Sequence, residues 1–173
     1  MAARIAVFVD GRNVHYGLRQ LGWPRLYDVG VFGRAIAGNN TLGLVHYYNA
    51  TPMQKYTTGP EYARQLDYYD AIDATPGVIF KKGYLMDAGP KPVEKLVDVM
   101  LALDLALGAY RDEYDIAALV SADGDFQPAI EEAQAAGKRV INFVFRNRRS
   151  FRLATSCDEV RFLKRKHFIP VVF

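Results

Sequence analysis

The stretch "RIAVFVDGRNVHYGLRQLG", residues 4–22, opens with apolar, largely β-branched residues and changes character at Asp10. Residues 4–10 have the composition of a buried strand, and the pattern that follows predicts a helix over 13–22, closed by Gly22 and Pro24. A strand that leads directly into a helix is a building unit of α/β folds. The stretch therefore predicts an α/β fold, provided that the alternation continues.

The rest of the chain repeats this alternation. It predicts a three-layer α/β/α sandwich with a mostly parallel, Rossmann-like central sheet. The length of 173 residues is that of one compact domain, and we expect a single domain over 1–173. Further strands are expected at 41–49, 77–85, 115–121 and 139–145, and helices at 28–38, 60–74, 93–110 and 126–137.

The composition is that of a soluble globular protein, with half of the residues apolar and about a quarter charged. No apolar run approaches the roughly 18 residues of a membrane span, so we expect a cytoplasmic protein without a membrane partner. The single cysteine, Cys157, supports neither a disulfide framework nor a zinc site. A homodimer is expected only because symmetric dimers are common.

Charge is distributed unevenly along the chain. Residues 138–173 carry ten Lys and Arg against two acids, whereas residues 1–137 carry twelve against seventeen. A basic C-terminal segment beside an acidic body is typical of a protein that binds a polyanion through a site containing carboxylates. A solvated surface without a partner explains the same charges equally well.

Acidic residues follow two of the predicted strands. Asp10 ends the first, and Ser121, Asp123 and Asp125 follow the strand at 115–121. In a parallel sheet, ligands bind outside the carboxyl ends of the strands, so these residues meet there if the two strands are neighbours. Helix capping is the alternative for Asp10 and for Asp125.

Asp98 stands in the segment 93–110, whose apolar residues surround a predicted helix and indicate that it is buried. A buried carboxylate needs a partner or a cation. Lys95, one turn earlier, is the alternative ion-pair partner. Clustered aspartates without His or Cys favour Mg²⁺ or Mn²⁺.

Other chemistries lack their motifs. The chain has no GxxxxGK[ST] phosphate loop, no GxGxxG after the first strand and no GxSxG serine motif. Its three histidines, His15, His46 and His167, are expected to be structural or on the surface.

Four segments resemble the NYN family, a branch of the PIN-like ribonuclease fold. They are "VFVDGRNV", "VEKLVDVMLALDL", "LVSADGDFQPAIEEAQAAGKRV" and "SFRLATSCDEVRFL", and their order and spacing agree with the family pattern. Two positions depart from it, because Ala122 and Leu96 stand where the family has glycine.

The resemblance implies a Mg²⁺- or Mn²⁺-dependent endoribonuclease that leaves a 5′-phosphate and a 3′-hydroxyl. It implies an acidic metal site of Asp10, Asp98, Asp123 and Asp125, with Asn13 beside them and Ser121 shaping the loop. An RNA-binding or regulatory module with little turnover is the main alternative, and a metal-dependent phosphatase or 5′-nuclease is another.

An RNA substrate requires basic groups around the acidic site. The candidates are Arg12, Lys95, Arg146, Arg148, Arg149 and Arg152. Tyr16, Tyr47, Tyr48 and Tyr56 could stack on bases, although packing in the core is the more common role of such tyrosines.

Overall fold

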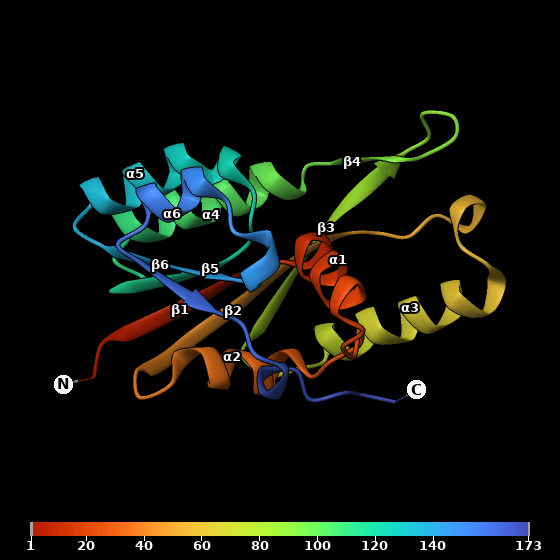
Figure 1. Ribbon diagram of the computed structural model, residues 1–173, viewed down its shortest axis with the longest axis horizontal. Helices are drawn as coiled ribbons and strands as arrows, with labels where there is room; N and C mark the ends of the chain where they lie inside the picture. The colour runs from red at the N-terminus through yellow and green to blue at the C-terminus, as the bar shows by residue number, and fades with distance from the viewer. Residues whose placement is uncertain (1, 173) are drawn as a thin grey trace.

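The computed structural model describes residues 2–172 and forms one seven-stranded sheet with helices on both faces (Figure 1). The strand order is β4-β3-β2-β1-β5-β6-β7. The strands are β1 (Arg4–Asp10), β2 (Thr41–Ala50), β3 (Val78–Met86), β4 (Val93–Lys95), β5 (Ile116–Val120), β6 (Arg139–Val144) and β7 (Glu159–Phe162).

Six α-helices and four short 3₁₀ helices connect the strands described in residues 2–172. The α-helices are α1 (Gly11–Leu21), α2 (Val29–Ala37), α3 (Gly59–Asp73), α4 (Val97–Tyr110), α5 (Gln127–Ala135) and α6 (Phe151–Ser156). The 3₁₀ helices are η1 (Gln54–Tyr56), η2 (Gly124–Phe126), η3 (Arg146–Arg148) and η4 (Arg165–His167). The predicted α/β fold is therefore confirmed.

The sheet is mixed, which corrects the expectation of a mostly parallel sheet. β4 runs antiparallel to β3 at one edge, with Met86 opposite Val93 and Tyr84 opposite Lys95. The pairings of β1 with β2 and β5, β2 with β3, β5 with β6 and β6 with β7 are parallel. The antiparallel strand arises in the segment that the sequence analysis assigned to a helix.

The segment 93–110 is a short strand followed by a helix, rather than one helix. Leu96 separates the two in the left-handed conformation, with φ at 73°. Three residues cannot establish a strand by their own preference, so pairing with β3 decides their conformation. The predicted helix at 93–110 is thus wrong in its first turn, and Lys95 lies on β4.

Alternate residues of the central strands face two separate cores because successive strand side chains point to opposite faces. Val7 and Val9 of β1 pack on the side of α1, α2 and α3, whereas Ala6 and Phe8 pack on the side of α4, α5 and α6. Figure 1 shows α4, α5 and α6 together above the sheet and α2 below it. Both faces of the sheet are therefore covered.

Candidate active site

The chain reverses its direction of travel across the sheet between β1 and β5. From β1 it moves outward to β2 and β3, and it later returns to β5 and moves outward to β6 and β7. β1 and β5 are parallel neighbours, with Val9 opposite Val120, so their carboxyl ends lie side by side. Such a switch point is where open α/β sheets bind ligands.

Asp10 occupies this point and is buried, with 5% of its surface exposed. One carboxylate oxygen accepts a hydrogen bond from the backbone N–H of Asn13 at 2.9 Å, which caps α1. The other accepts from the Ser121 hydroxyl at 2.8 Å and so joins the end of β1 to that of β5. The capping alternative is therefore confirmed, and the same carboxylate lies at the switch point.

Burial raises the pKa of Asp10 from 3.8 to about 6. The hydrogen bonds from Asn13 and Ser121 act in the opposite direction, and the negative charges of Asp98 and Glu94 add to the rise. Asp10 is thus a poorly solvated carboxylate in a field of other acids. An ionised group in such surroundings is costly until a cation compensates it.

The loop after β5 continues the network that starts at Asp10. The Asp123 backbone N–H donates to the Ser121 hydroxyl oxygen at 3.0 Å, and the Asp125 N–H donates to the Asp123 carboxylate at 3.0 Å. Asp123 therefore caps η2, whereas Asp125, for which capping was the alternative, is exposed and makes no side-chain cap to α5. The amide of the fully buried Asn142 holds the Ser121 carbonyl at 2.8 Å, a support that the sequence analysis missed.

Asp98 lies in the first turn of α4 and is exposed, which corrects the expectation that it is buried. Its helix is apolar all round, but one of its faces is open to solvent. Among residues 2–172, Lys95 forms no ion pair with Asp98, so that alternative is wrong. Partial desolvation raises the pKa of Asp98, and the charges of Asp123 and Asp125 raise it further. Asp98 thus interacts electrostatically with Asp123 and Asp125 in the loop after β5, here called the acidic loop.

Glu94 is a fifth acid that the sequence analysis did not identify. Its side chain is only 10% exposed and lies 3.8 Å from the Arg12 guanidinium. Burial raises the pKa of Glu94, and the charge of Asp98 adds to the rise. Strand alternation places Glu94 and Lys95 on opposite faces of β4, so recognising the strand would have revealed this acid.

The donor set suits a hard divalent cation because it consists of carboxylate oxygens without His or Cys. The mutual effect of these acids on their pKa values indicates repulsion that a cation would relieve. Within residues 2–172, however, no three Asp, Glu, His or Cys side chains stand close enough to ligate one ion. Carboxylate oxygens and negative charge are what Mg²⁺ or Mn²⁺ requires of its ligands. The described side chains do not stand close enough together to form a complete coordination shell.

A family model for the NYN domain matches residues 4–164. The chain belongs to the NYN family. This is a PIN-like ribonuclease family, as the sequence motifs indicated. Among solved structures, a Vibrio parahaemolyticus protein of unknown function, VPA0982, has a TM-score of 0.69 and 22% identity over 96% of each chain. It supports the fold alone, and no curated protein matches the chain.

In this NYN domain, the loop after β6 brings arginines to the edge that carries the acids, because β6 runs parallel to β5. Arg152 packs against the acidic loop, where a Cβ added to Gly124 would lie 3.0 Å from its Cδ. The Arg146 guanidinium lies 4.8 Å from the centre of the Phe162 ring. Arg148 has a buried Nε without a partner among the described residues, and Arg149 is exposed.

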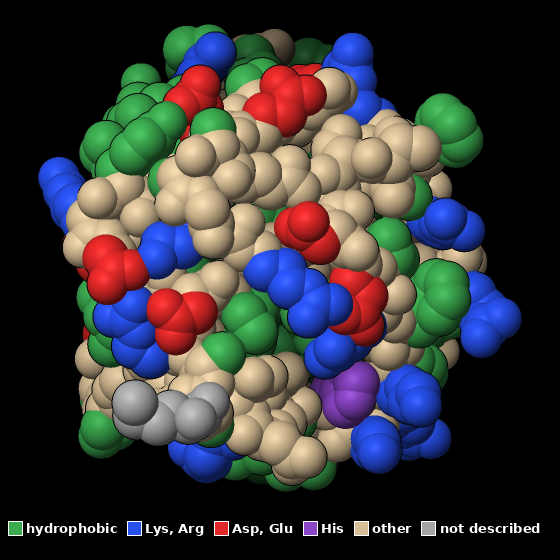
Figure 2. Space-filling model, turned by 90° about the vertical axis from the view of Figure 1, so that its left-hand side faces the viewer, with side chains coloured by type: hydrophobic (Ala, Val, Ile, Leu, Met, Phe, Trp, Pro, Cys, Tyr) green, Lys and Arg blue, Asp and Glu red, His purple; other side chains and the backbone are tan. Residues whose placement is uncertain are grey.

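The other basic candidates have different surroundings. Arg12 approaches Glu94 and lies over the exposed ring of Tyr16, 5.7 Å from its centre. Lys95 is exposed on β4. On the side of the molecule where β1 begins, basic and acidic side chains are intermingled (Figure 2). Part of the basic C-terminal segment is paired there, since Arg139 bonds Glu159 at 2.6 Å.

The tyrosine candidates divide between core and surface. Tyr47 and Tyr48 are buried, as expected for core residues, and the Tyr48 hydroxyl donates to Asp104 at 2.6 Å. The Tyr56 hydroxyl donates a hydrogen bond to Asp87, which is not one of the site carboxylates. Tyr16 is therefore the candidate that combines exposure with a neighbouring site arginine. No helix within residues 2–172 is long and apolar enough to span a membrane.

Proposed function

We propose that this NYN-family chain is a Mg²⁺- or Mn²⁺-dependent endoribonuclease that hydrolyses RNA phosphodiester bonds. The buried Asp10 carries the proposal, because its pKa of about 6 reflects burial together with the charges of Asp98 and Glu94 at the switch point. Perturbed carboxylates at such a place are typical of catalytic sites. Membership of a PIN-like ribonuclease family supports the same conclusion.

Asp10, Asp98, Asp123 and Asp125 would hold the metal, and Glu94 would add negative charge beside them. The bound ion would polarise the phosphodiester and lower the pKa of a water molecule. Asn13 and Ser121 orient Asp10 through its two hydrogen bonds, and Ser121 also fixes the backbone of Asp123. These bonds occupy one lone pair on each Asp10 oxygen and leave the others for a cation.

Arg12 and Arg152 flank the acids and would bind the phosphates beside the scissile bond. Arg146, Arg148 and Arg149 would extend this contact along the strand, and Lys95 would contribute from β4. A guanidinium can donate two parallel hydrogen bonds to one phosphate, which positions the substrate as well as attracting it. The repulsion between RNA and the carboxylates makes such groups necessary.

Labelled RNA incubated with Mn²⁺ or Mg²⁺ tests the proposal. We expect cleavage that EDTA stops and that Asp123→Asn reduces at least about 100-fold, because a neutral amide cannot replace an anionic ligand. The amide oxygen can still accept the Asp125 N–H bond, so η2 should persist. Asp70→Asn, an exposed change on α3, is the matched control and should cleave normally. Cleavage that survives EDTA and Asp123→Asn would refute the mechanism.

An RNA-binding module with little turnover is the second candidate. The incomplete ligand arrangement among residues 2–172 favours it, as does Ala122 in place of the family's glycine. RNA binding by the wild type, with no cleavage in Mg²⁺ or Mn²⁺, would support this alternative over the enzyme.

A further inference from the structure

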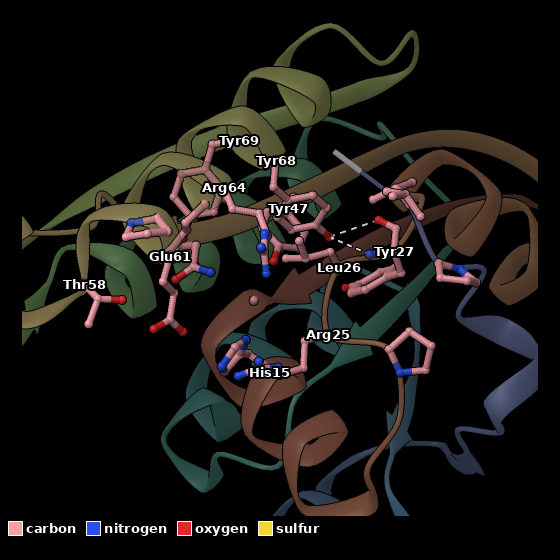
Figure 3. A pocket seen from close by; sticks show the side chains of 18 residues that line it. His15, Arg25, Leu26, Tyr27, Tyr47, Thr58, Glu61, Arg64, Tyr68 and Tyr69 are labelled. Carbon is pink, nitrogen blue, oxygen red and sulfur yellow. Dashed lines mark hydrogen bonds between the residues drawn. The ribbon is translucent and has the colours of Figure 1, made fainter.

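A cavity of about 670 Å³ lies at the start of α1, and its volume is within the size range of small-ligand pockets. Gly11, directly after Asp10, and Tyr47 and Asn49 of β2 form part of its wall. The remaining wall comes from α1, α3, the segment 24–27 and residues 170–172 (Figure 3). The cavity is therefore continuous in the fold with the carboxyl ends of β1 and β2.

Two arginines in the wall of this cavity are unpaired. Arg25 and Arg64 are exposed, and neither forms an ion pair or a hydrogen bond within residues 2–172. Figure 3 shows Arg64 reaching inward from α3, with Arg25 and His15 on the opposite wall. Glu61 is the single acid in the described lining. The charge of this wall favours an anion, and free guanidinium groups suit phosphate.

Neutral polar groups accompany the two arginines. Asn49, Thr58 and Gln65 line the cavity, and Gln65 uses its amide N–H to bond the Tyr69 hydroxyl at 3.0 Å. Among the described residues, its carbonyl oxygen accepts no hydrogen bond and is available to a ligand. Amide and hydroxyl groups around a partly apolar cavity match the edge of a nucleobase.

We propose that this cavity binds one nucleotide of the RNA strand, with its phosphate between Arg25 and Arg64. The proposal rests on the proposed RNA substrate, but it concerns binding and does not require cleavage. A nucleotide held here would anchor the strand beside Asp10. A free mononucleotide offers the same phosphate and base, so the test must separate the two sources.

Fluorescence anisotropy with a labelled single-stranded RNA of about 12 nucleotides, in EDTA, measures binding without turnover. We expect Arg25→Ala and Arg64→Ala each to weaken binding about tenfold and to reduce the salt slope by about 0.7, the value for one lost phosphate contact to a single strand. Arg34→Ala removes an exposed arginine of α2 that lies outside the cavity and forms no ion pair in the described part of the chain, and it should change the affinity less than about twofold.

Unchanged RNA affinity and salt slope in both cavity variants would overturn the proposal. AMP binding that is lost in Arg64→Ala while RNA binding is retained would also overturn it, by assigning the cavity to a free nucleotide. If Mn²⁺ supports wild-type cleavage and the cavity variants bind normally, the cavity proposal fails alone. If cleavage is absent but the variants bind weakly, the enzyme proposal fails and the cavity proposal stands.

A separate observation concerns the outer face of α4 and the residue before it. Five large apolar side chains form a stripe there: Leu96 (52% exposed), Val99 (58%), Leu103 (52%), Leu107 (42%) and Tyr110 (59%). Figure 2, which looks at one end of the molecule, shows hydrophobic side chains gathered at its upper left. A contiguous apolar stripe of this kind marks an interaction surface.

The spacing of the stripe identifies its partner. Successive members lie three, four, four and three residues apart, so the pattern is symmetric about Leu103. When two copies of such a helix pack antiparallel across a two-fold axis, Leu96 meets Tyr110, Val99 meets Leu107, and Leu103 meets its own copy. No charged residue interrupts the stripe. The pattern is self-complementary, as an isologous interface requires.

We infer that two copies of this chain associate through antiparallel α4 helices. At the observed exposures, the five side chains offer roughly 500 Å² per copy, so a pair would bury about 1,000 Å², the lower limit for a specific interface. Lys95, which has no ion-pair partner within residues 2–172, lies at one end of the stripe and would approach the partner's Glu132, which the Tyr110 hydroxyl bonds at the other end. We therefore expect a reversible dimer.

Sedimentation velocity over micromolar to sub-millimolar concentrations measures the association. We expect wild-type dimers and, for Leu103→Glu, an association at least about 100-fold weaker, because two carboxylates would meet at the axis. Leu44→Glu, at an exposed leucine of β2 outside the stripe, is the control and should dimerise normally. A wild type that stays monomeric throughout this range would overturn the inference.

Cysteine pairs test the register in a Cys157→Ser background. Leu103→Cys should form an oxidised homodimer, and a mixture of Val99→Cys and Leu107→Cys chains should crosslink to each other faster than either does to itself. Equal crosslinking of all pairs, or a dimer unaffected by Leu103→Glu, would overturn the antiparallel α4 arrangement.

Discussion

Replacing Asp10 by asparagine should stabilise the protein above pH 6, even though it removes a residue of the proposed site. Burial and neighbouring acids raise the pKa of Asp10 from 3.8 to about 6. This difference corresponds to about 3 kcal/mol of unfolding free energy. Removal of a functional residue is expected to increase stability where the charge of that residue is unfavourable in the folded protein.

The direction of the pH dependence follows from the raised pKa. Well below pH 3.8 the carboxyl is protonated in both the folded and the unfolded chain, so it imposes no penalty. As the pH rises through about 6, the folded state must ionise a buried group, and its contribution to stability is lost. The amide introduced by Asp10→Asn does not ionise, so the variant escapes that loss.

Urea unfolding of both proteins in EDTA at several pH values between about 4 and 7.5 measures the effect. The free energy of unfolding of Asp10→Asn, relative to wild type, should rise by up to about 3 kcal/mol across this range. Any constant cost of the amide, such as a weaker bond to Ser121, cancels in the change with pH. Asp28→Asn, which alters the equivalent cap of α2, measures the constant cost of replacing a capping carboxylate by an amide, roughly a few tenths of a kcal/mol because Asn and Asp cap helices about equally well. A difference between Asp10→Asn and wild type that stays constant over the whole pH range would refute the reasoning.

Three further substitutions test the supports of the site by chemical denaturation. Leu96→Gly should stabilise the protein by about 1 kcal/mol, because φ at this position is 73° and glycine adopts it without strain; a loss of stability would contradict that conformation. Asn142→Ala should destabilise it by about 2 to 4 kcal/mol, since two buried carbonyls, including that of Ser121, lose their donor; a change below about 1 kcal/mol would argue against the contact. Gly11→Ala should also destabilise it, by about 1 to 3 kcal/mol, because a Cβ there would lie 2.8 Å from the Tyr47 hydroxyl; wild-type stability would show that the wall can move.

The sequence was sufficient for the parts of the fold that local pattern determines. Strand β1 and the strand before Ser121 are apolar and bounded by Asp10 and by the acidic loop, so their type and ends were predictable. The general rules for α/β sheets were enough to predict that the ends of these two strands could meet. The hydrogen bond from Ser121 to Asp10 confirms that the two strand ends meet.

The segment around Leu96 shows where local pattern is insufficient. Val93, Leu96 and Val97 continue the apolar pattern of α4, so periodicity alone extends the helix backward. The strand at 93–95 forms because β3 offers an antiparallel partner, a contact that helical spacing does not reveal. The family glycine that Leu96 replaces was the available signal, because a glycine there indicates a left-handed residue and hence a break.

The same error determined which acids were found. Assigning 93–110 to one helix made Lys95 a neighbour of Asp98 and hid Glu94, whereas the strand turns Glu94 toward Arg12 and Asp10. The burial of Asp98 was overestimated because an all-apolar helix was taken to be covered on every side. In the structure the outer face of α4 is open, which is the face for which we propose a second copy.

The capping role of Asp10 does not exclude the metal role, although the two were alternatives at the level of sequence. A carboxylate offers about four lone-pair positions, and the bonds from Asn13 and Ser121 use two of them. Those bonds fix the orientation of the group at the switch point, while burial removes the water that would otherwise solvate its charge. The capping bond therefore holds Asp10 in place, while burial and the neighbouring Glu94 and Asp98 disfavour its ionised form. The carboxyl group then either takes up a proton or needs a cation to compensate its charge.

A substitution at Ser121 should separate the two roles of Asp10. Ser121→Ala removes one bond to Asp10 and the acceptor of the Asp123 N–H but leaves the Asn13 cap, so we expect α1 to persist while divalent-cation binding weakens about tenfold or more. Isothermal titration with Mn²⁺, alongside circular dichroism, would measure both properties. Unchanged Mn²⁺ affinity would show that Ser121 does not orient a ligand, because the hydroxyl supplies one of the two bonds that fix the Asp10 carboxylate.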